Sequence, residues 1–344
     1  MIVIMRDGAA VKEISGVIRS VESAGGQAHV LNSGQRVVIG VNGPGIETTS
    51  KQLGALAGVR EVVTSPPPFQ LASRLFNPDD TVIKVGKVAI GGGTFTIIAG
   101  PCSIESEEQL MKTAEAVKTG GGDMLRGGAF KPRTSPYAFQ GLGLKGLKLL
   151  AQAGQAFDIP VVTEVLDTRD VSWVSEYTDV IQIGARNMQN FSLLKEVGKT
   201  NKPILLKRGM LSTIEEWLNC AEYILNGGNT HVILCERGIR TFETYTRNTL
   251  DISAVPAAKE LSHLPVIVDP SHATGKISLI GPTSLASVAA GANGLTVEVH
   301  CNPKEALSDK DQALTPAQFS DLSIKVRALY KFMSTQADNA NDQP

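Results

Sequence analysis

Eight short apolar segments recur along the second part of this chain, and each is separated from the next by enough residues to form a helix. Apolar runs of this kind are typical of parallel strands that are buried on both faces. Eight strand–helix units over about 250 residues predict a closed (β/α)8 barrel, the TIM barrel of the α/β class. An open doubly wound sheet is the alternative, but no GxGxxG sequence follows the first expected strand and no Walker sequence is present. The expected strands are 95–99, 123–125, 160–165, 180–183, 204–207, 231–235, 266–268 and 295–299.

The first 65 residues carry a different pattern. Alternating strand-like and helical segments give the order β-α-β-β-α-β, which is that of a ferredoxin-like unit. A run of three prolines, Pro66 to Pro68, then favours a stiff connection. We therefore predict a small ferredoxin-like domain over 1–65, a linker over 66–83, the barrel over 84–335 and a polar C-terminal tail over 336–344.

The composition narrows the class of protein. The formal net charge of the 344 residues is only −1, so we expect no nucleic-acid partner and no membrane surface. No apolar run is long enough to span a bilayer, and the N-terminus does not resemble a signal peptide. The four cysteines lack CxxC spacing, which favours reduced thiols and a cytoplasmic location.

The segment 125–135 is unusually rich in groups that bind anions. It holds Arg126, Lys131 and Arg133, two glycines and two hydroxyl side chains directly after an expected strand. Arginine offers a planar fork of donors that matches carboxylate and phosphate oxygens, and glycine lets the backbone approach a ligand closely. The segment predicts a site for a small anionic substrate, with a solvated basic loop as the alternative.

A second group of residues has metal-binding chemistry. Cys102, His272 and Glu298 lie at the ends of the first, seventh and eighth expected strands, which are neighbours in a closed barrel. Asp309 follows the eighth strand and can fold back over them. A thiolate, an imidazole and two carboxylates at one rim suit a divalent transition metal. We call Cys102, His272, Glu298 and Asp309 the metal-type residues. Each residue alone is better explained as a core or hydrogen-bonding residue, so the inference depends on their joint placement.

Five cations follow the second, fourth, fifth and sixth expected strands, on the part of the rim that faces the metal-type residues. They would repel one another without a multivalent anion between them, such as a small molecule with both a phosphate and a carboxylate. Surface ion pairs with Glu164 and Glu236 are one alternative, and a Schiff-base role for the barrel lysine Lys207 is another. The five cations are Arg126, Lys131, Arg186, Lys207 and Arg237.

Several of these segments together resemble one enzyme family, the 3-deoxy-D-arabino-heptulosonate 7-phosphate (DAHP) synthases. The similarity extends over 84–314, and the N-terminal unit resembles the regulatory extension of one subgroup. The resemblance implies that phosphoenolpyruvate condenses with erythrose 4-phosphate, the first step of the shikimate pathway to chorismate and the aromatic amino acids. The segments are GPCS at 100–103, RGGAFKPRTS at 126–135, GARNMQN at 184–190, LKRG at 206–209 and VDPSH at 268–272.

The resemblance also implies roles for individual residues. One divalent metal ion per subunit, with Mn²⁺ favoured and Fe, Co, Zn or Cu possible, would be held by Cys102, His272, Glu298 and Asp309. Arg133 and Thr134 would receive the erythrose 4-phosphate, and the catalytic residues would be Lys131, Glu164 and His272, with Glu164 handling water. The phosphoenolpyruvate contacts would be Arg126, Lys131, Ala185, Arg186, Lys207 and Arg237.

Two alternatives to this function remain at the level of the sequence. The 3-deoxy-D-manno-octulosonate 8-phosphate synthases share the barrel and the phosphoenolpyruvate chemistry, but they usually carry an Asn-rich segment where this chain has Pro132, Arg133 and Thr134. A catalytically silent amino-acid sensor is the other alternative. The subgroup with an N-terminal extension implies a homotetramer whose front domain binds Tyr or Phe as a feedback inhibitor.

Overall fold

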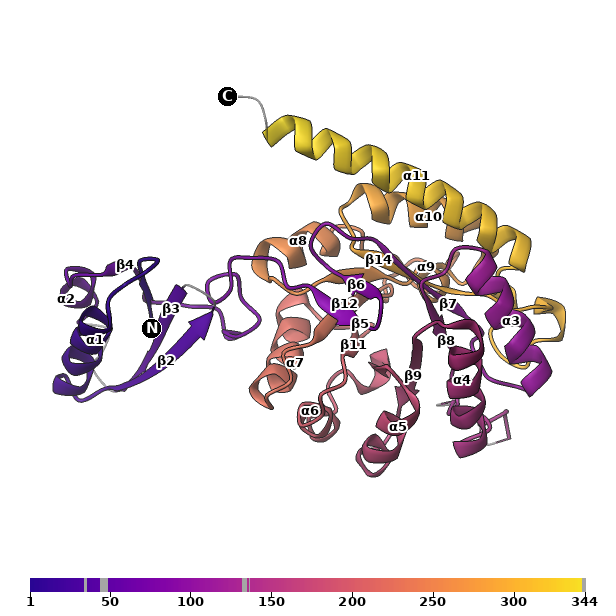
Figure 1. Ribbon diagram of the computed structural model, residues 1–344, viewed down its shortest axis with the longest axis horizontal. Helices are drawn as coiled ribbons and strands as arrows, with labels where there is room; N and C mark the ends of the chain where they lie inside the picture. Colours follow the sequence, from indigo (N-terminus) through magenta and orange to yellow (C-terminus); the bar gives the residue numbers. More distant parts are fainter. Residues whose placement is uncertain (34–35, 44–48, 132–134, 136, 342–344) are drawn as a thin grey trace. The chain divides into compact units, whose positions relative to one another are not determined.

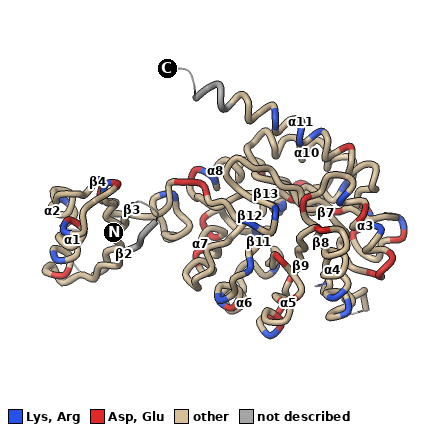
Figure 2. The backbone as a smooth tube through the Cα atoms, in the orientation of Figure 1, with Lys and Arg blue, Asp and Glu red and all other residues tan. Residues whose placement is uncertain are grey.

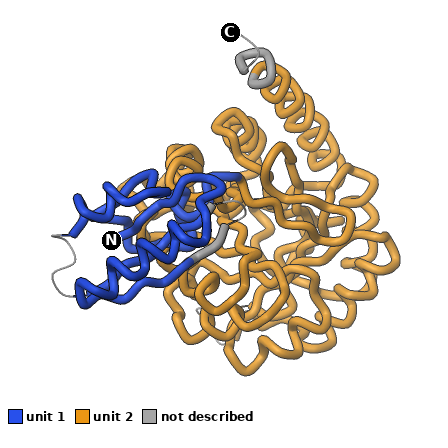
Figure 3. The backbone as a smooth tube through the Cα atoms, turned by 60° about the vertical axis from the view of Figure 1, so that its left-hand side comes forward, with its two compact units in different colours: residues 1–79 blue, residues 80–344 orange. Residues whose placement is uncertain are grey.

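The computed structural model describes residues 1–33, 36–43, 49–131, 135 and 137–341. The chain divides into two compact units, Met1–Asp79 and Asp80–Pro344, which Figure 3 shows in separate colours. Among the described residues, no helix combines the length and the apolar character needed to cross a membrane.

The front unit is a four-stranded antiparallel sheet with two helices, in the predicted βαββαβ order (Figure 1). The strands pair in the spatial order β2-β3-β1-β4. Val3 and Met5 of β1 pack with Val17 and Val21 of α1, because alternate residues of a strand point to the same face. The elements are β1 Ile2–Met5, α1 Val11–Ser23, β2 Gln27–Ser33, β3 Arg36–Asn42, α2 Ser50–Gly54 and β4 Val59–Val63.

The opposite face of this sheet is covered by residues that follow β4. Ile2, Ile4 and Val38 form a second buried cluster, and Leu75 and Phe76 pack against it. The compact front unit consequently continues beyond its last strand, up to Asp79.

The second unit contains the predicted closed barrel of eight parallel strands. The expected strands are confirmed, with ends that differ by at most one residue. Arg126, for example, is the last residue of its strand instead of following it. The strands in chain order are β7 Thr96–Gly100, β8 Met124–Arg126, β9 Val161–Val165, β10 Val180–Ile183, β11 Ile204–Lys207, β12 Val232–Glu236, β13 Val266–Val268 and β14 Gly294–Glu298.

Helices surround this barrel, as Figure 1 shows for the elements from α3 to α11. Ser106 and Thr213 begin two of them by accepting a hydrogen bond from a backbone N–H of the first turn. The last helix continues to Asn341, into the expected polar tail. The helices are α3 Glu107–Thr119, α4 Leu144–Phe157, α5 Val171–Tyr177, α6 Phe191–Val197, α7 Ile214–Asn226, α8 Ala254–Leu261, α9 Pro270–Thr274, α10 Ile277–Ala289 and α11 Pro316–Asn341.

A short hairpin, β5 Ile83–Val85 with β6 Val88–Ile90, precedes the barrel. Its apolar side chains join the buried cluster inside the barrel, which includes Val162, Leu205 and Ile267 near the beginnings of their strands. The hairpin therefore closes the N-terminal end of the barrel, and the C-terminal strand ends remain available for a site.

Candidate active site

The C-terminal ends of the barrel strands surround one cavity of about 390 Å³. Figure 2 marks the Lys and Arg positions of the barrel, including positions beside β12. Seven of the lining side chains are Lys or Arg, whereas Glu164 and Asp309 are the acidic ones. Such a surplus of positive charge in a concave site attracts anions. The lining residues are Arg126, Lys131, Ser135, Ala138, Glu164, Gln182, Gly184, Ala185, Arg186, Lys207, Met210, Arg237, Arg240, Arg247, His272 and Asp309.

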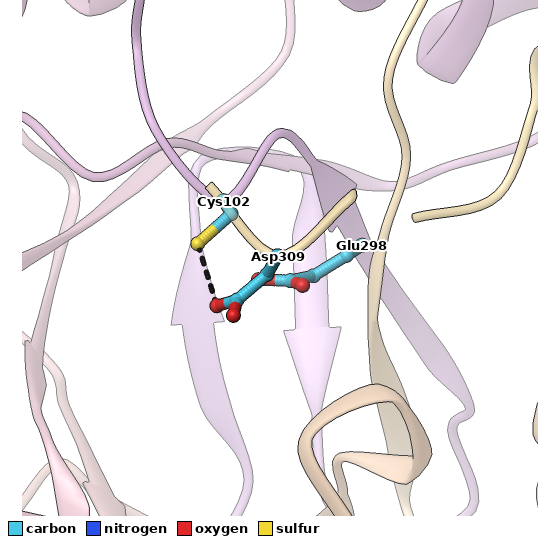
Figure 4. A group of neighbouring side chains, drawn as sticks. All are labelled: Cys102, Glu298 and Asp309. Atoms are coloured by element: carbon cyan, nitrogen blue, oxygen red, sulfur yellow. Dashed lines mark hydrogen bonds between the residues drawn. The ribbon is translucent and has the colours of Figure 1, made fainter. Parts of the chain in front are cut away.

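Beside this cavity, Cys102, Glu298 and Asp309 bring a thiol and two carboxylates together (Figure 4). One potential ligand atom from each lies within 4.8 Å of the others. Cys102 follows β7 and Glu298 ends β14, and these strands are paired neighbours. Asp309 comes from the loop after β14, where its φ of 49° is in the left-handed region that non-glycine residues rarely adopt. The Sγ atom of Cys102 lies 3.0 Å from Oδ2 of Asp309.

His272 lies next to this group and turns one ring nitrogen toward it. Its Nε2 atom is 3.2 Å from Oε1 of Glu298 and 4.0 Å from Oδ2 of Asp309. Its Nδ1 atom is 2.6 Å from Oδ2 of Asp269, whose Oδ1 also accepts the backbone N–H of His272 and caps α9. Hydrogen bonding at Nδ1 fixes the ring so that Nε2 is the nitrogen presented to a metal ion.

Burial and neighbouring charges set the protonation of these groups. Burial, together with Glu298, raises the pKa of the Cys102 thiol to about 12. Burial would also raise the pKa of Asp309, but the Cys102 thiol, His272 and Arg247 outweigh it and lower that pKa to about 2. Burial lowers the pKa of His272 despite the carboxylates of Asp269 and Glu298. The residues therefore offer two carboxylates and a neutral imidazole, and only the thiol must lose its proton to bind a metal.

The sequence predicted that the cations stand across the rim from the metal-type residues. In the structure, some of them contact these residues directly. Arg126 donates to Oε1 of Glu298 at 2.8 Å, and Nζ of Lys131 lies 2.9 Å from both Sγ and the carbonyl oxygen of Cys102. Lys207 contacts Asp269 at 2.5 Å. The anion-binding and metal-type groups are thus interleaved. A ligand in the cavity can contact both sets.

The other predicted residues of the cavity are also brought together. Arg237 is buried and donates to the carbonyl oxygen of His272 at 3.3 Å, whereas Arg186 is exposed at the rim beside Ala185. Glu164 of β9 lies so close to Gly184 that a Cβ atom there would overlap its carboxylate. Arg133 and Thr134 lie outside the described residues.

The proposed surface ion pairs between the predicted cations and Glu236 are not found among the described residues. Glu236 is fully buried and pairs with Arg208, a residue that does not line the cavity. Lys207 and His272 share the Asp269 carboxylate, which favours a structural and anion-binding environment for this lysine over a free Schiff-base amine.

Four further residues of the site were not singled out from the sequence. Asp269 orients Lys207 and His272, whereas the sequence showed it only as part of the VDPSH segment, with no role of its own. Arg240 and Arg247 reach the cavity from the loop after β12. Gln312 donates to Oε2 of Glu298 at 2.6 Å. Only the fold-back of two loops brings these last residues to the rim, so local sequence carries little signal for them.

Comparison with known proteins places both units in one group. Residues 76–334 match the model of the DAHP synthetase I family, and residues 1–64 match that of the DAHP synthase ferredoxin-like domain. The chain is 51% identical to the phospho-2-dehydro-3-deoxyheptonate aldolase of Thermotoga maritima over 329 residues, which cover 96% of this chain and 97% of that protein. It is 34% identical over 252 residues to a 2-dehydro-3-deoxyphosphooctonate aldolase of Koribacter versatilis, covering 67% of this chain and 89% of that protein.

Solved structures give the same result. The crystal structure of the Thermotoga maritima phospho-2-dehydro-3-deoxyheptonate aldolase (DAHP synthase) aligns with a TM-score of 0.78 at 50% identity, covering 96% of this chain and 97% of that chain. A truncated form of the Thermotoga maritima 3-deoxy-D-arabino-heptulosonate 7-phosphate synthase aligns with a TM-score of 0.73 at 53% identity. That alignment covers 77% of this chain and 97% of the truncated one.

Proposed function

This chain belongs to the DAHP synthetase I family and is a DAHP synthase, and from that premise we propose how its cavity works. The substrates are phosphoenolpyruvate and erythrose 4-phosphate, and the products are DAHP and inorganic phosphate. The observation that carries the proposal is the contact between the two sets of side chains. Arg126 touches Glu298, and Lys131 touches Cys102, so an anion held by the cations lies beside the metal-type residues.

Phosphoenolpyruvate binds to the cations of the cavity. Its phosphate and carboxylate carry charge that Arg126, Lys131, Arg186, Lys207 and Arg237 neutralise, and Ala185 supplies backbone beside Arg186. Arg126 and Lys207 are almost fully buried, and each already contacts one carboxylate. Their positions are consequently set before the substrate arrives, which lowers the entropy cost of binding.

The donor set fits one divalent transition metal ion. Cys102, His272, Glu298 and Asp309 offer one sulfur, one nitrogen and carboxylate oxygens, a mixture that Mn²⁺, Fe²⁺, Co²⁺, Zn²⁺ and Cu²⁺ all accept. When bound, such an ion supplies a Lewis acid that polarises the aldehyde oxygen. Mn²⁺ is the ion we favour, and activity after chelation and re-addition of each metal tests that choice.

The side chains of the cavity then serve the individual steps. The C3 carbon of phosphoenolpyruvate forms a bond to the aldehyde carbon, water adds at C2, and the C2–O bond to phosphate breaks. Lys131 is positioned to give a proton to the new alkoxide, because it lines the cavity and its Nζ atom lies 2.9 Å from Sγ of Cys102, one of the metal-type residues. Glu164 is positioned to orient the water, because it lines the cavity together with Lys207 and Arg186.

The sugar phosphate binds at the outer part of the same cavity. Arg133 and Thr134 receive its phosphate in this proposal, on the strength of the 126–135 segment, although they lie outside the described residues. Arg240 and Arg247 line the cavity as well and add positive charge there. The high identity to an enzyme named for the seven-carbon product favours erythrose 4-phosphate over a five-carbon aldehyde.

One experiment separates the candidate functions. Phosphate release from phosphoenolpyruvate is measured with purified protein and Mn²⁺, with erythrose 4-phosphate, with arabinose 5-phosphate, or with neither sugar. We expect release only with erythrose 4-phosphate. Release with arabinose 5-phosphate alone would assign the octulosonate activity. No release with either sugar would leave the silent sensor as the function.

The front unit serves regulation in this proposal. Its match to the ferredoxin-like domain of DAHP synthases suggests that Tyr or Phe binds there and inhibits, in a homotetramer. The compact front unit ends at Asp79, so a chain that begins at Asp80 removes it without cutting the barrel. The truncated enzyme should keep its activity and lose the inhibition. Equal sensitivity to Tyr and Phe in both forms would contradict the regulatory role.

A further inference from the structure

A second charged group lies behind the cavity, on the outer side of the barrel strands. Lys207 and Arg237 line the cavity, and the residues next to them in the chain, Arg208 and Glu236, point the other way, as successive side chains along a strand do. One terminal nitrogen of Arg208 donates to Oε2 of Glu236 at 2.9 Å and to Oδ2 of Asp251 at 2.8 Å. The Arg208 and Glu236 side chains are 6% and 0% exposed.

The guanidinium of Arg208 is fixed by more than these two carboxylates. Its Nε atom donates to the carbonyl oxygen of Ser212, in the connection between β11 and α7, at 2.9 Å. Its central carbon lies 6.0 Å from the ring centre of Trp217, a fully buried residue of α7. Arg208 therefore has a single well-defined position, anchored in the body of the barrel.

Its two carboxylate partners stand at the two ends of one loop. Glu236 directly precedes the loop 237–253, and Asp251 lies near its end, before α8. Glu236 also accepts the backbone N–H of Gly238 at 2.6 Å through Oε1. Inside the loop, Ile239 and Thr249 form an antiparallel bridge. The two halves of the loop thus run side by side, and Arg208 joins them at the base.

This loop carries three of the seven cations that line the cavity, namely Arg237, Arg240 and Arg247. We propose that Arg208, Glu236 and Asp251 form a clasp, a group of ion pairs at the base of the loop that positions these three arginines for the substrate anions. The assignment of the arginines to substrate rests on the proposed function. Asp251 touches neither the cavity nor the metal-type residues in the described structure, so it is a positioning residue that acts through the loop.

Asp251 is the suitable place for a perturbation, because its side chain is 22% exposed while Glu236 is fully buried. The variant Asp251→Asn keeps the shape and removes the charge that Arg208 contacts. Asp123→Asn is the matched control. Asp123 has a side chain 29% exposed and pairs with Arg327 at 2.8 Å, at the beginning of β8 and so at the opposite end of the barrel. Asp251→Glu retains the carboxylate and tests rescue.

Two measurements on the full-length, metal-loaded enzyme test the clasp. In Asp251→Asn, amide hydrogen exchange across 238–250 should become about tenfold faster, as expected when a charge-assisted hydrogen bond is lost. The KM values for phosphoenolpyruvate and erythrose 4-phosphate should rise several-fold, with a smaller change in kcat, because the arginines bind the substrates. Asp251→Glu should restore at least part of both properties, and Asp123→Asn should change neither in this way.

Three outcomes would overturn the clasp: unchanged exchange in 238–250, faster exchange throughout the barrel, or unchanged KM values despite faster loop exchange. The wild-type assay is run in parallel and judges the proposed function separately. If wild-type protein releases no phosphate, the substrate assignment fails. The exchange measurement still decides whether Asp251 holds the loop.

Discussion

Replacing Asp269 by asparagine tests how much the site depends on one buried carboxylate. Asp269 is 1% exposed and accepts from Nζ of Lys207 at 2.5 Å, while its Oδ2 and Oδ1 atoms lie 2.6 Å from Nδ1 and 2.9 Å from the backbone nitrogen of His272. Asparagine fills the same volume and can still cap α9. What it removes is the negative charge opposite the buried Lys207 ammonium.

The size of the effect follows from this geometry. Removing one partner of a buried ion pair costs about 3–5 kcal/mol, because the other charge is left without compensation. For a domain of this size, each kcal/mol lowers Tm by about 2–4 °C, so Asp269→Asn should lower Tm by roughly 6–20 °C. Loss of the acceptor for the His272 ring should also weaken metal binding by about 10- to 100-fold.

The stability difference between wild type and Asp269→Asn should also depend on pH. Burial alone would raise the pKa of Asp269, but His272 and Lys207 hold it well below 3.8. When a carboxylate has a lower pKa in the folded state than in the unfolded state, it stabilises the folded protein. This contribution is complete above the unfolded-state pKa and is lost as the pH falls through the folded-state pKa. The contribution of the Asp269 carboxylate to the difference between wild type and Asp269→Asn should therefore be lost below about pH 4, and the difference should narrow there.

Thermal unfolding in the presence of a chelator is the assay, since a bound ion would add its own stabilisation. Asp321→Asn is the control, because Asp321 forms an exposed pair with Lys325 and such pairs contribute little. An Asp269→Asn protein with the Tm of the wild type at pH 7 would refute the reasoning. A difference that grew as the pH fell below about 4 would refute the electrostatic part of it.

Three further predictions concern the metal-type residues and Glu164. Gln312→Leu should weaken Mn²⁺ binding by about tenfold or more, because the amide of Gln312 no longer orients Glu298; equilibrium dialysis measures this, and unchanged affinity would contradict it. Metal binding at pH 7 should release about one proton from the Cys102 thiol, because burial raises the pKa of this thiol to about 12. Calorimetry in buffers of different ionisation enthalpy should detect the released proton. Binding heats that do not depend on the buffer would argue against thiolate ligation. Gly184→Ala should displace the Glu164 carboxylate, which a Cβ atom would overlap, and so reduce kcat. The Tm should change little, since the backbone at Gly184 has a φ of −68° that alanine adopts readily. Full activity would remove Glu164 from the proposed water step.

Most of the architecture could be predicted because it depends on periodic patterns. Eight apolar runs predicted the eight strands, and the closure of the barrel follows from their number and spacing. That closure makes β13, β14 and β7 neighbours, which is why the sequence could place Cys102, His272 and Glu298 at one rim. Some strand ends moved by one residue, as for Arg126, because end positions depend on hydrogen bonds to the next strand.

The pairing of side chains across the rim could not be predicted in the same way. The sequence placed the cations opposite the metal-type residues, yet Arg126 bonds to Glu298 and Lys131 to Cys102. Which way a long side chain extends depends on space that only the assembled loops define. The same limit applies to Arg208, whose partners Glu236 and Asp251 are distant from it in the chain and gave no local signal.

The most direct test of the account is a crystal of the full-length protein soaked with Mn²⁺ and phosphoenolpyruvate, with anomalous diffraction recorded near the manganese edge. We expect one strong anomalous peak within bonding distance of Cys102, His272, Glu298 and Asp309, with phosphoenolpyruvate in contact with Arg186 and Lys207. Manganese bound at other residues, or phosphoenolpyruvate bound away from this cavity, would contradict it.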